Sequence, residues 1–258
     1  MLAPLLLLTL ACSSAPPSVS QWLWSRKDVD ALERARAVGA VDAAVSIAEL
    51  SWDAPSSSVH TALRLPPDVA GDPAALVIRL DDSFAHASAR RGSSGDSIGD
   101  AVDAALAHVL AAAGPRFSST PVQLDFDAPA SQLEQYAAWL GHLRSSSLRG
   151  RVVWTTSLVS HVENARYDAL FAGLIDGTVV QVFDTGDAFT PATADALVRA
   201  LSSLRVPFAL GLGAFERAHT DHGAWLAMVP KLAVLSGYRG VFVFAAGHDW
   251  RALRTELP

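Results

Sequence analysis

Two aspartates stand two positions apart in a run of alternating character. In residues 122–127, Val-Gln-Leu-Asp-Phe-Asp, apolar side chains alternate with Gln123, Asp125 and Asp127. In an extended strand this spacing places the three polar side chains on one face. Two carboxyl groups on such a face can act as acid and base, because burial and a neighbouring like charge raise the pKa of one of them. The run therefore offers the chemistry of glycosidic bond cleavage, with Asp125 and Asp127 as candidate catalytic residues.

Polar residues recur near the carboxyl ends of other strand-like runs. Arg79 and Asp81 share one face, and Arg79 should lie beside Asp125 on the neighbouring strand. A buried Arg79–Asp125 ion pair is the structural alternative to a catalytic role, and its loss through Asp125→Ala should cost about 3–5 kcal/mol. Asp184, at the tip of a later run, is the third catalytic candidate. The candidate substrate-binding residues are Glu49, Arg79, Asp81, Gln181, Glu216, Trp24 and Trp154.

Eight runs rich in Val, Ile, Phe and Trp alternate with stretches of helical period, which is the pattern of repeated βα units. The expected strands are residues 19–24, 43–52, 75–81, 122–127, 151–156, 178–184, 207–213 and 240–245. The expected helices include residues 27–38, 97–112, 131–145, 165–175, 191–204 and 223–235. Strands recur about every thirty residues, the length of one βα unit. The sequence therefore predicts an α/β fold, a single-domain (β/α)8 TIM barrel over residues 19–258, with a doubly wound open sheet as the alternative.

The carboxyl ends of all strands in such a barrel meet at one mouth, where barrel enzymes build their active sites. We therefore expect Asp127, Asp184 and Glu216 to meet there. Glu49 ends the second strand and is expected on the face that carries Ile47. The irregular residues 51–73 read as an insertion after that strand.

Aromatic and small residues shape the predicted mouth. Trp24 and Trp154 lie on or beside strands, where an indole ring can stack on a sugar or simply fill the core. Ala209, Gly211 and Gly213 form the inward face of one strand. Residues this small are predicted to leave space for a ligand.

Composition narrows the class of protein. Of the 258 residues, 50% are hydrophobic and 18% charged, which excludes a disordered chain and permits a large core. The formal net charge is −6 and no basic stripe occurs, so no nucleic-acid partner is expected. The single cysteine excludes a disulfide framework and a cysteine-based zinc site.

Cofactor signatures are weak or absent. The first expected strand is not followed by Gly-x-Gly-x-x-Gly, and no Walker-type loop is present. His219, Asp221 and His222 offer metal-ligand types, and Asp81-Asp82 faintly resembles a strand end of polysaccharide deacetylases. A metal-dependent deacetylase is therefore a minor alternative, and the main prediction includes no metal and no cofactor.

The amino-terminal residues predict export. An apolar run precedes Cys12 and is too short to span a bilayer as a helix, but it fits the core of a signal peptide. Cys12 follows a small residue, as in the lipobox of bacterial lipoproteins, and residues 13–18 would form a tether. We expect residues 1–18 to make this chain a cell-envelope lipoprotein of the periplasm or outer membrane, held by its lipid anchor alone. An ordinary secretory signal is the alternative.

The sequence resembles a bacterial family of exported, barrel-like proteins without a defined activity. The resemblance rests on Gln21-Trp-Leu-Trp-Ser-Arg26, on the Gln-Leu-Asp-Phe-Asp-Ala strand, and on Tyr136 in the helix that follows it. It extends to residues 156–158 and 180–182, and it spans residues 19 to about 250. It implies a barrel and export.

A more distant resemblance is to the family-18 glycosidases, whose fourth strand ends in Asp-x-x-Asp-x-Asp-x-Glu. Asp125 and Asp127 match the second and third Asp, whereas Val122 replaces the first. Pro129 replaces the Glu, which in that family protonates the leaving oxygen. Gln181-Val-Phe-Asp184 is similar to the Met-x-Tyr-Asp of their sixth strand. The resemblance therefore transfers only the three aspartates, without the family's acid.

These observations favour an exported, glycoside-hydrolase-like barrel that acts on or binds polysaccharide or oligosaccharide at the C-terminal face. One alternative is a non-catalytic carbohydrate-binding barrel, in which the lost Glu marks lost chemistry. A third is a scaffold for a partner in the cell envelope.

Overall fold

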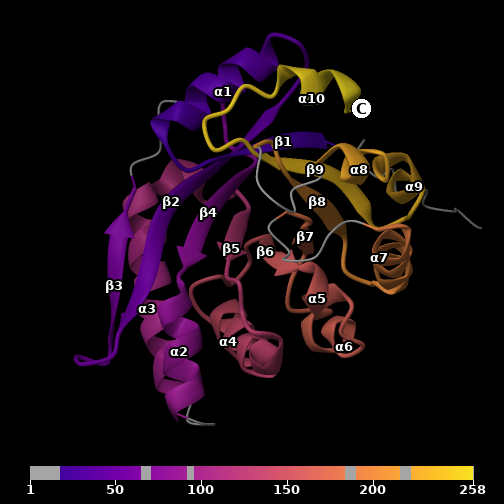
Figure 1. Ribbon diagram of the computed structural model, residues 1–258. Helices are drawn as coiled ribbons and strands as arrows, with labels where there is room; N and C mark the ends of the chain where they lie inside the picture. The colour runs from indigo at the N-terminus through magenta and orange to yellow at the C-terminus, as the bar shows by residue number, and fades with distance from the viewer. Residues whose placement is uncertain (1–17, 65–70, 92–95, 184–189, 216–221, 258) are drawn as a thin grey trace, which may run out of the picture.

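Eight parallel strands close into a barrel, as the sequence predicts (Figure 1). The computed structural model describes residues 18–64, 71–91, 96–183, 190–215 and 222–257. Pairing of β1 with both β2 and β9 closes the sheet. The barrel strands are β1 (Ser18–Leu23), β2 (Asp42–Asp53), β4 (Ala75–Leu80), β5 (Val122–Asp125), β6 (Val153–Leu158), β7 (Gly177–Gln181), β8 (Phe208–Gly213) and β9 (Tyr238–Phe244). The open doubly wound sheet is therefore excluded.

Helices lie around the outside of this barrel. Their bounds are α1 (Arg26–Arg36), α2 (Asp82–Arg91), α3 (Asp96–Ala113), α4 (Leu133–Ser145), α5 (Val159–Val162), α6 (Tyr167–Phe171), α7 (Pro191–Ser203), α8 (His222–Leu226), α9 (Val229–Ala233) and α10 (Arg251–Glu256). Two short 3-10 helices span Pro115–Phe117 and Ala130–Gln132. In Figure 1, α10 lies beside α1, so the end of the described chain packs near its beginning. No helix in the described ranges is long and apolar enough to cross a membrane.

The expected insertion after the second strand contains a ninth strand, β3 (Ser58–Leu63). β2 extends beyond the end of its neighbour β1. The edge of β2 that β1 does not cover pairs with β3 in antiparallel register, from the pair Ala48 and Leu63 to the pair Asp53 and Ser58. The hairpin brings the chain back toward the mouth, where the Arg64 amide donates to the carbonyl of Ile47 at 2.7 Å.

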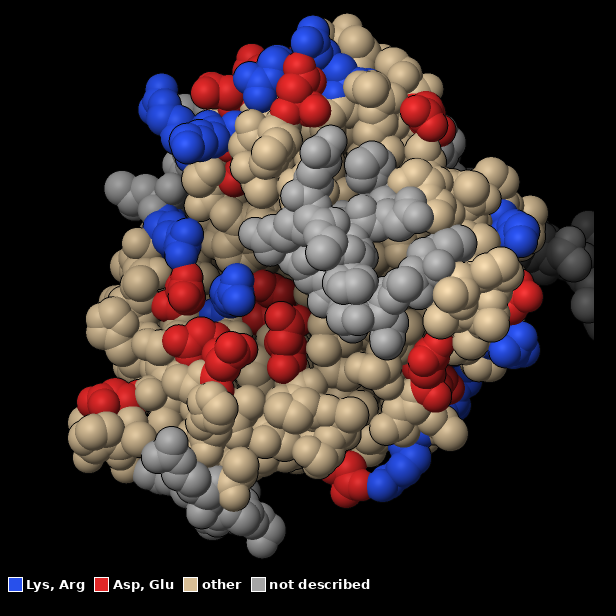
Figure 2. Space-filling model, in the orientation of Figure 1, with Lys and Arg blue, Asp and Glu red and all other residues tan. Residues whose placement is uncertain are grey.

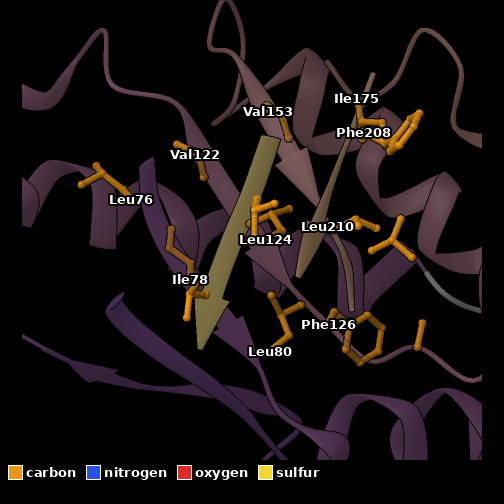
Figure 3. Packing of buried hydrophobic residues seen from close by; sticks show 14 of the residues in the cluster. Leu76, Ile78, Leu80, Val122, Leu124, Phe126, Val153, Ile175, Phe208 and Leu210 are labelled. Carbon is orange, nitrogen blue, oxygen red and sulfur yellow. The ribbon is translucent and has the colours of Figure 1, made fainter. Parts of the chain in front are cut away.

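Alternating side chains divide the core into an outer and an inner layer. The outward residues of β4 and β5 pack in the layer between strands and helices (Figure 3), and they are Leu76, Ile78, Leu80, Val122, Leu124 and Phe126. Inside the barrel, Trp22, Ala44, Val77 and Val179 belong to a separate buried cluster. The inward and outward faces predicted for β4 and β5 are therefore confirmed.

A β-bulge changes the face on which Glu49 lies. The register between β2 and β4 shifts between Ser46 and Ala48. Ile47 and Ala48 both pack in the outer layer, so the alternation restarts one residue later and Glu49 points into the barrel mouth. The expectation that Glu49 shares the face of Ile47 was wrong. An extra residue in one strand re-aims the side chains that follow it.

Candidate functional site

A pocket of ≈ 490 Å³ opens at the carboxyl ends of the barrel strands. Its volume falls within the usual range for small-molecule sites. Figure 2 shows acidic side chains gathered in a hollow on this face, with a basic group at its edge. The pocket is lined by Trp22, Trp24, Glu49, Arg64, Arg79, Asp125, Asp127, Thr156, Leu158, Gln181, Phe183 and Phe244. The structure thus brings together most of the polar residues that the sequence predicts for the mouth.

Asp125 is the deeper of the two central carboxyl groups. Burial raises its pKa to about 6, and the negative charges of Asp127 and Glu49 act in the same direction. A hydrogen bond with Thr156 and the charge of Arg79 oppose this shift without cancelling it. Asp125 is therefore a group that can hold or release a proton near neutral pH.

Asp127 lies at the end of the same inward face, in a tight turn. The amide of Ala128 donates to the carbonyl of Phe126 at 2.9 Å, so Asp127 is the middle residue of a three-residue turn. Gln181 Nε2 donates to Asp127 Oδ1 at 3.2 Å across the pocket. Burial raises the pKa of Asp127, and nearby Asp82 adds to this effect, while Arg79 and the Gln181 hydrogen bond lower it.

Two arginines reach the pocket in different ways. Arg64 forms an ion pair with Glu49 and also donates to the Trp24 carbonyl oxygen at 3.3 Å. Arg79 has no ion pair or hydrogen bond to a described residue, and its Cζ lies 5.8 Å from the centre of the Trp24 ring. The Glu49 charge is thus paired, whereas Asp125 and Asp127 lack a salt-bridge partner among the described residues.

Asp28 fixes the loop that carries Trp24. The Asp28 carboxylate accepts from the amides of Trp24 at 3.0 Å and Ser25 at 2.8 Å. It also accepts from the Gly247 amide at 2.8 Å, which joins the loop after β9 to the start of α1. Trp24 is consequently held at the mouth by backbone contacts to a buried carboxylate, and its ring forms part of the pocket wall.

Trp22 forms the floor of the pocket. Its Nε1 donates to Gln123 Oε1 at 3.2 Å inside the barrel. A Cβ added at Gly211 would lie 2.9 Å from the Trp22 ring, and one at Gly213 would lie 2.9 Å from Phe215. The small face of β8 therefore accommodates aromatic rings, and the prediction that it leaves space for a ligand was wrong.

Several predicted residues lie elsewhere. Asp81 caps the start of α2 by accepting from the Ser83 amide at 3.0 Å. Trp154 stands at the start of β6, packed against Gly177 at the opposite end of the barrel from the pocket. Neither residue lines the pocket. The remaining predicted site positions, Asp184, Glu216 and Cys12, lie outside the described residues, so their predicted roles stay predictions.

The metal alternative rests on residues of which little is described. His219 and Asp221 lie outside the described ranges, and nothing is described of the His222 side chain. Among the described side chains, no group of three His, Cys, Asp or Glu could hold a metal ion.

The pocket residues that were not among the predicted site residues are Trp22, Arg64, Thr156, Leu158, Phe183 and Phe244. For Arg64 a signal was present, because residues 58–63 alternate in the manner of a strand and lie close behind β2. A hairpin there would return Arg64 to the neighbourhood of Glu49. Leu158 was missed because the corresponding expected strand, residues 151–156, ends two residues before the observed one, Val153–Leu158.

The fold is similar to that of a chitinase from Ipomoea carnea, with 13% sequence identity and a TM-score of 0.55, covering 93% of this chain and 98% of that one. It is also similar to the Bacillus cereus spore cortex-lytic enzyme SleL, with 12% identity and a TM-score of 0.57, covering 95% and 75%. The xylanase and α-amylase inhibitor protein XAIP-II from Scadoxus multiflorus matches with 13% identity and a TM-score of 0.50, covering 94% and 97%. No family model and no curated protein matches the sequence.

This chain therefore has the barrel fold of family-18 chitinase-like structures. Identities this low establish the fold alone. The neighbours include both enzymes and an inhibitor, so the fold does not decide between catalysis and binding. The site residues must make that decision.

Proposed function

We propose that this protein binds polysaccharide in the mouth pocket, on a barrel related to glycoside hydrolases. The observation that carries the proposal is that the Trp24 ring lines the same open pocket as the hydrogen-bonded pair Asp127 and Gln181. A sugar presents an apolar face and a rim of hydroxyl groups. The indole can cover the first, and carboxylate and amide groups can hydrogen-bond the second.

Glycoside hydrolysis is the second candidate, and Asp125 favours it. Its pKa of about 6 suits a group that donates a proton to a glycosidic oxygen near neutral pH. Asp127, as the carboxylate, would then attack the anomeric carbon or take a proton from the attacking water. Against this candidate, Pro129 occupies the position that corresponds to the acid of the family-18 pattern. Binding therefore remains the leading proposal.

We propose further that the chain is exported and anchored to the cell envelope through Cys12. This proposal rests on the sequence of residues 1–18 alone. A polysaccharide-binding barrel would meet its ligand in that compartment. The remaining alternatives, a scaffold role and a metal-dependent deacetylase, have no specific observation in their favour.

A glycan array probed with the wild-type protein and with Asp127→Asn tests the leading proposal. We expect the wild type to retain one class of oligosaccharide and Asp127→Asn to bind it more weakly. Asp103→Asn is the matched control, because Asp103 lies on the outer helix α3 and does not line the pocket. Failure of the wild type to bind any glycan, or equal binding by Asp127→Asn, would overturn the proposal.

Analysis of the bound oligosaccharides after prolonged incubation separates the two candidates. New reducing ends that depend on Asp125 and Asp127 would establish hydrolysis. Recovery of intact oligosaccharide would establish binding without cleavage.

A further inference from the structure

The backbone around Asp127 is held from outside its own strand. Asp127 lies between Phe126 and Ala128 in the tight turn described above, and Ala128 is fully buried. The turn fixes the local backbone angle, but it does not fix the turn relative to the next strand. The Asp127 side chain reaches Gln181 on β7 across the intervening strand β6. Its position therefore also depends on a contact that holds the turn against β6.

His161 supplies this second contact. The residue lies in the short helix α5, directly after β6, and its side chain is almost completely buried, with 1% exposed. His161 Nε2 lies 2.6 Å from the carbonyl oxygen of Ala128, and the Leu158 amide lies 3.2 Å from His161 Nδ1. Both backbone groups adjoin the pocket, because Asp127 precedes Ala128 and Leu158 itself lines it.

The two contacts fix the state of the imidazole ring. A carbonyl oxygen can only accept, so Nε2 must carry a proton and donate it. An amide N–H can only donate, so Nδ1 must be unprotonated and accept. The ring is therefore the neutral Nε2–H tautomer, and it bridges the loop after β5 to the end of β6.

We propose that His161 is the positioning residue of the mouth pocket, holding Asp127 in place through the Ala128 carbonyl. The effect of His161 on ligand binding rests on the proposed function, but the contacts that His161 makes can be tested without a ligand. His161 does not line the pocket and touches no ligand. Its role is to set where the Asp127 carboxylate stands relative to Gln181 and Trp24.

The electrostatic surroundings of His161 agree with this role. Burial lowers the pKa of His161, and the hydrogen bond to Ala128 opposes that shift. The helices packed against α5 carry Asp168 on α6 and Asp195 and Arg199 on α7, whereas burial is the main cause of the shift. The ring is thus uncharged at neutral pH, as the bridge requires.

The experiment compares His161→Ala, His161→Gln and Tyr167→Phe. His161→Ala removes both hydrogen bonds, whereas His161→Gln keeps an N–H donor for Ala128. Tyr167→Phe is the control for stability. The Tyr167 hydroxyl is buried and bonds Ser157 at 2.7 Å and Thr178 at 3.3 Å in the outer layer, away from the pocket lining.

The first readout is the NMR titration of the Asp127 carboxyl, with Asp103 as an internal reference. Partial burial raises the pKa of Asp127 and the hydrogen bond from Gln181 lowers it, so displacement of its turn should change that pKa. We expect this change in His161→Ala, partial restoration in His161→Gln, and no change in Tyr167→Phe. Titration of Asp127 unchanged in folded His161→Ala would overturn the proposal.

The second readout is glycan binding, combined in a double-variant cycle. His161→Ala should weaken binding about tenfold, the equivalent of one hydrogen bond. The same substitution should have no further effect in Asp127→Asn, because it acts through Asp127. Additive losses, or an equal loss in Tyr167→Phe, would show a merely structural role. If the wild type binds no glycan, the proposed function fails while the titration still decides on His161.

Discussion

Arg79 and Asp125 are register partners on neighbouring strands, yet no ion pair joins their side chains. The Arg79 guanidinium instead reaches the pocket, 5.8 Å from the centre of the Trp24 ring. Asp125 keeps a raised pKa, because the charge of Arg79 only partly opposes the effects of burial and of Asp127. The site therefore holds an arginine and two carboxyl groups in proximity without neutralising them in pairs.

Asp125→Asn should stabilise the protein at pH 7.5. At this pH the wild-type carboxylate is ionised, although burial raises its pKa in the folded protein to about 6. Relative to an exposed carboxyl group, this shift lowers the free energy of unfolding by about 3 kcal/mol. An amide removes this penalty, so the melting temperature should rise by several degrees. The sequence-based expectation of a 3–5 kcal/mol loss assumed a buried Arg79–Asp125 ion pair, which the structure lacks.

Asp103→Asn is the contrasting variant for this prediction. Burial raises the pKa of Asp103, but hydrogen bonds from Ser146 and Ser147 lower it, and the net shift is downward. The ionised carboxylate of Asp103 therefore favours the folded state. Its loss should lower the melting temperature slightly. A fall for Asp125→Asn as well would contradict the electrostatic account of the pocket.

The contribution of Asp125 to the free energy of unfolding should fall as the pH rises from about 4 to about 6. In this window the folded protein binds more protons than the unfolded chain, because the folded-state pKa is the higher one. Rising pH therefore favours unfolding, and the loss is complete above the folded-state pKa. Thermal melts of wild type and Asp125→Asn across this range should diverge with increasing pH, and parallel curves would refute the shift.

The sequence predicted the barrel and the inward faces of β4 and β5, because strand spacing and side-chain alternation are local properties. Other features depend on contacts that the sequence does not display. Glu49 reaches the mouth through a bulge in β2, and Gly211 makes room for a ring from the distant strand β1. Trp154 was expected nearer a carboxyl end because the predicted strand, residues 151–156, ended two residues before the observed one.

Gly211→Ala should destabilise the barrel by about 1–3 kcal/mol, because overpacking displaces core side chains. The new Cβ would lie 2.9 Å from the Trp22 ring and 3.4 Å from the Gln181 backbone. Gly141→Ala is the matched control, since its nearest new neighbour, Leu174, lies at 3.9 Å and the position is within α4. There alanine should stabilise the helix by about 0.5–1 kcal/mol. Denaturant unfolding measures both, and equal effects would argue against Trp22 as a rigid floor.

Cys12 should carry the lipid if the amino-terminal segment acts as predicted. Metabolic labelling of cells with a fatty-acid analogue should mark the wild type and the control Ser13→Ala. Cys12→Ala should carry no label and should leave the membrane fraction. Equal labelling of Cys12→Ala and the wild type would rule out lipidation at this residue.

Trp24 and Trp154 provide a direct test of which end of the barrel meets the ligand. Trp24 lines the pocket beside Arg79, whereas Trp154 packs against Gly177 at the start of β6. Trp24→Ala removes this part of the pocket wall, and loss of one stacking contact should weaken glycan binding about tenfold. Trp154→Ala should lower the melting temperature because it empties part of the barrel interior, but the folded fraction should bind glycan with unchanged affinity. Calorimetric titration well below both melting temperatures compares the two variants. Weaker binding by Trp154→Ala than by Trp24→Ala would place the ligand away from the carboxyl ends of the strands and refute the assignment of the pocket.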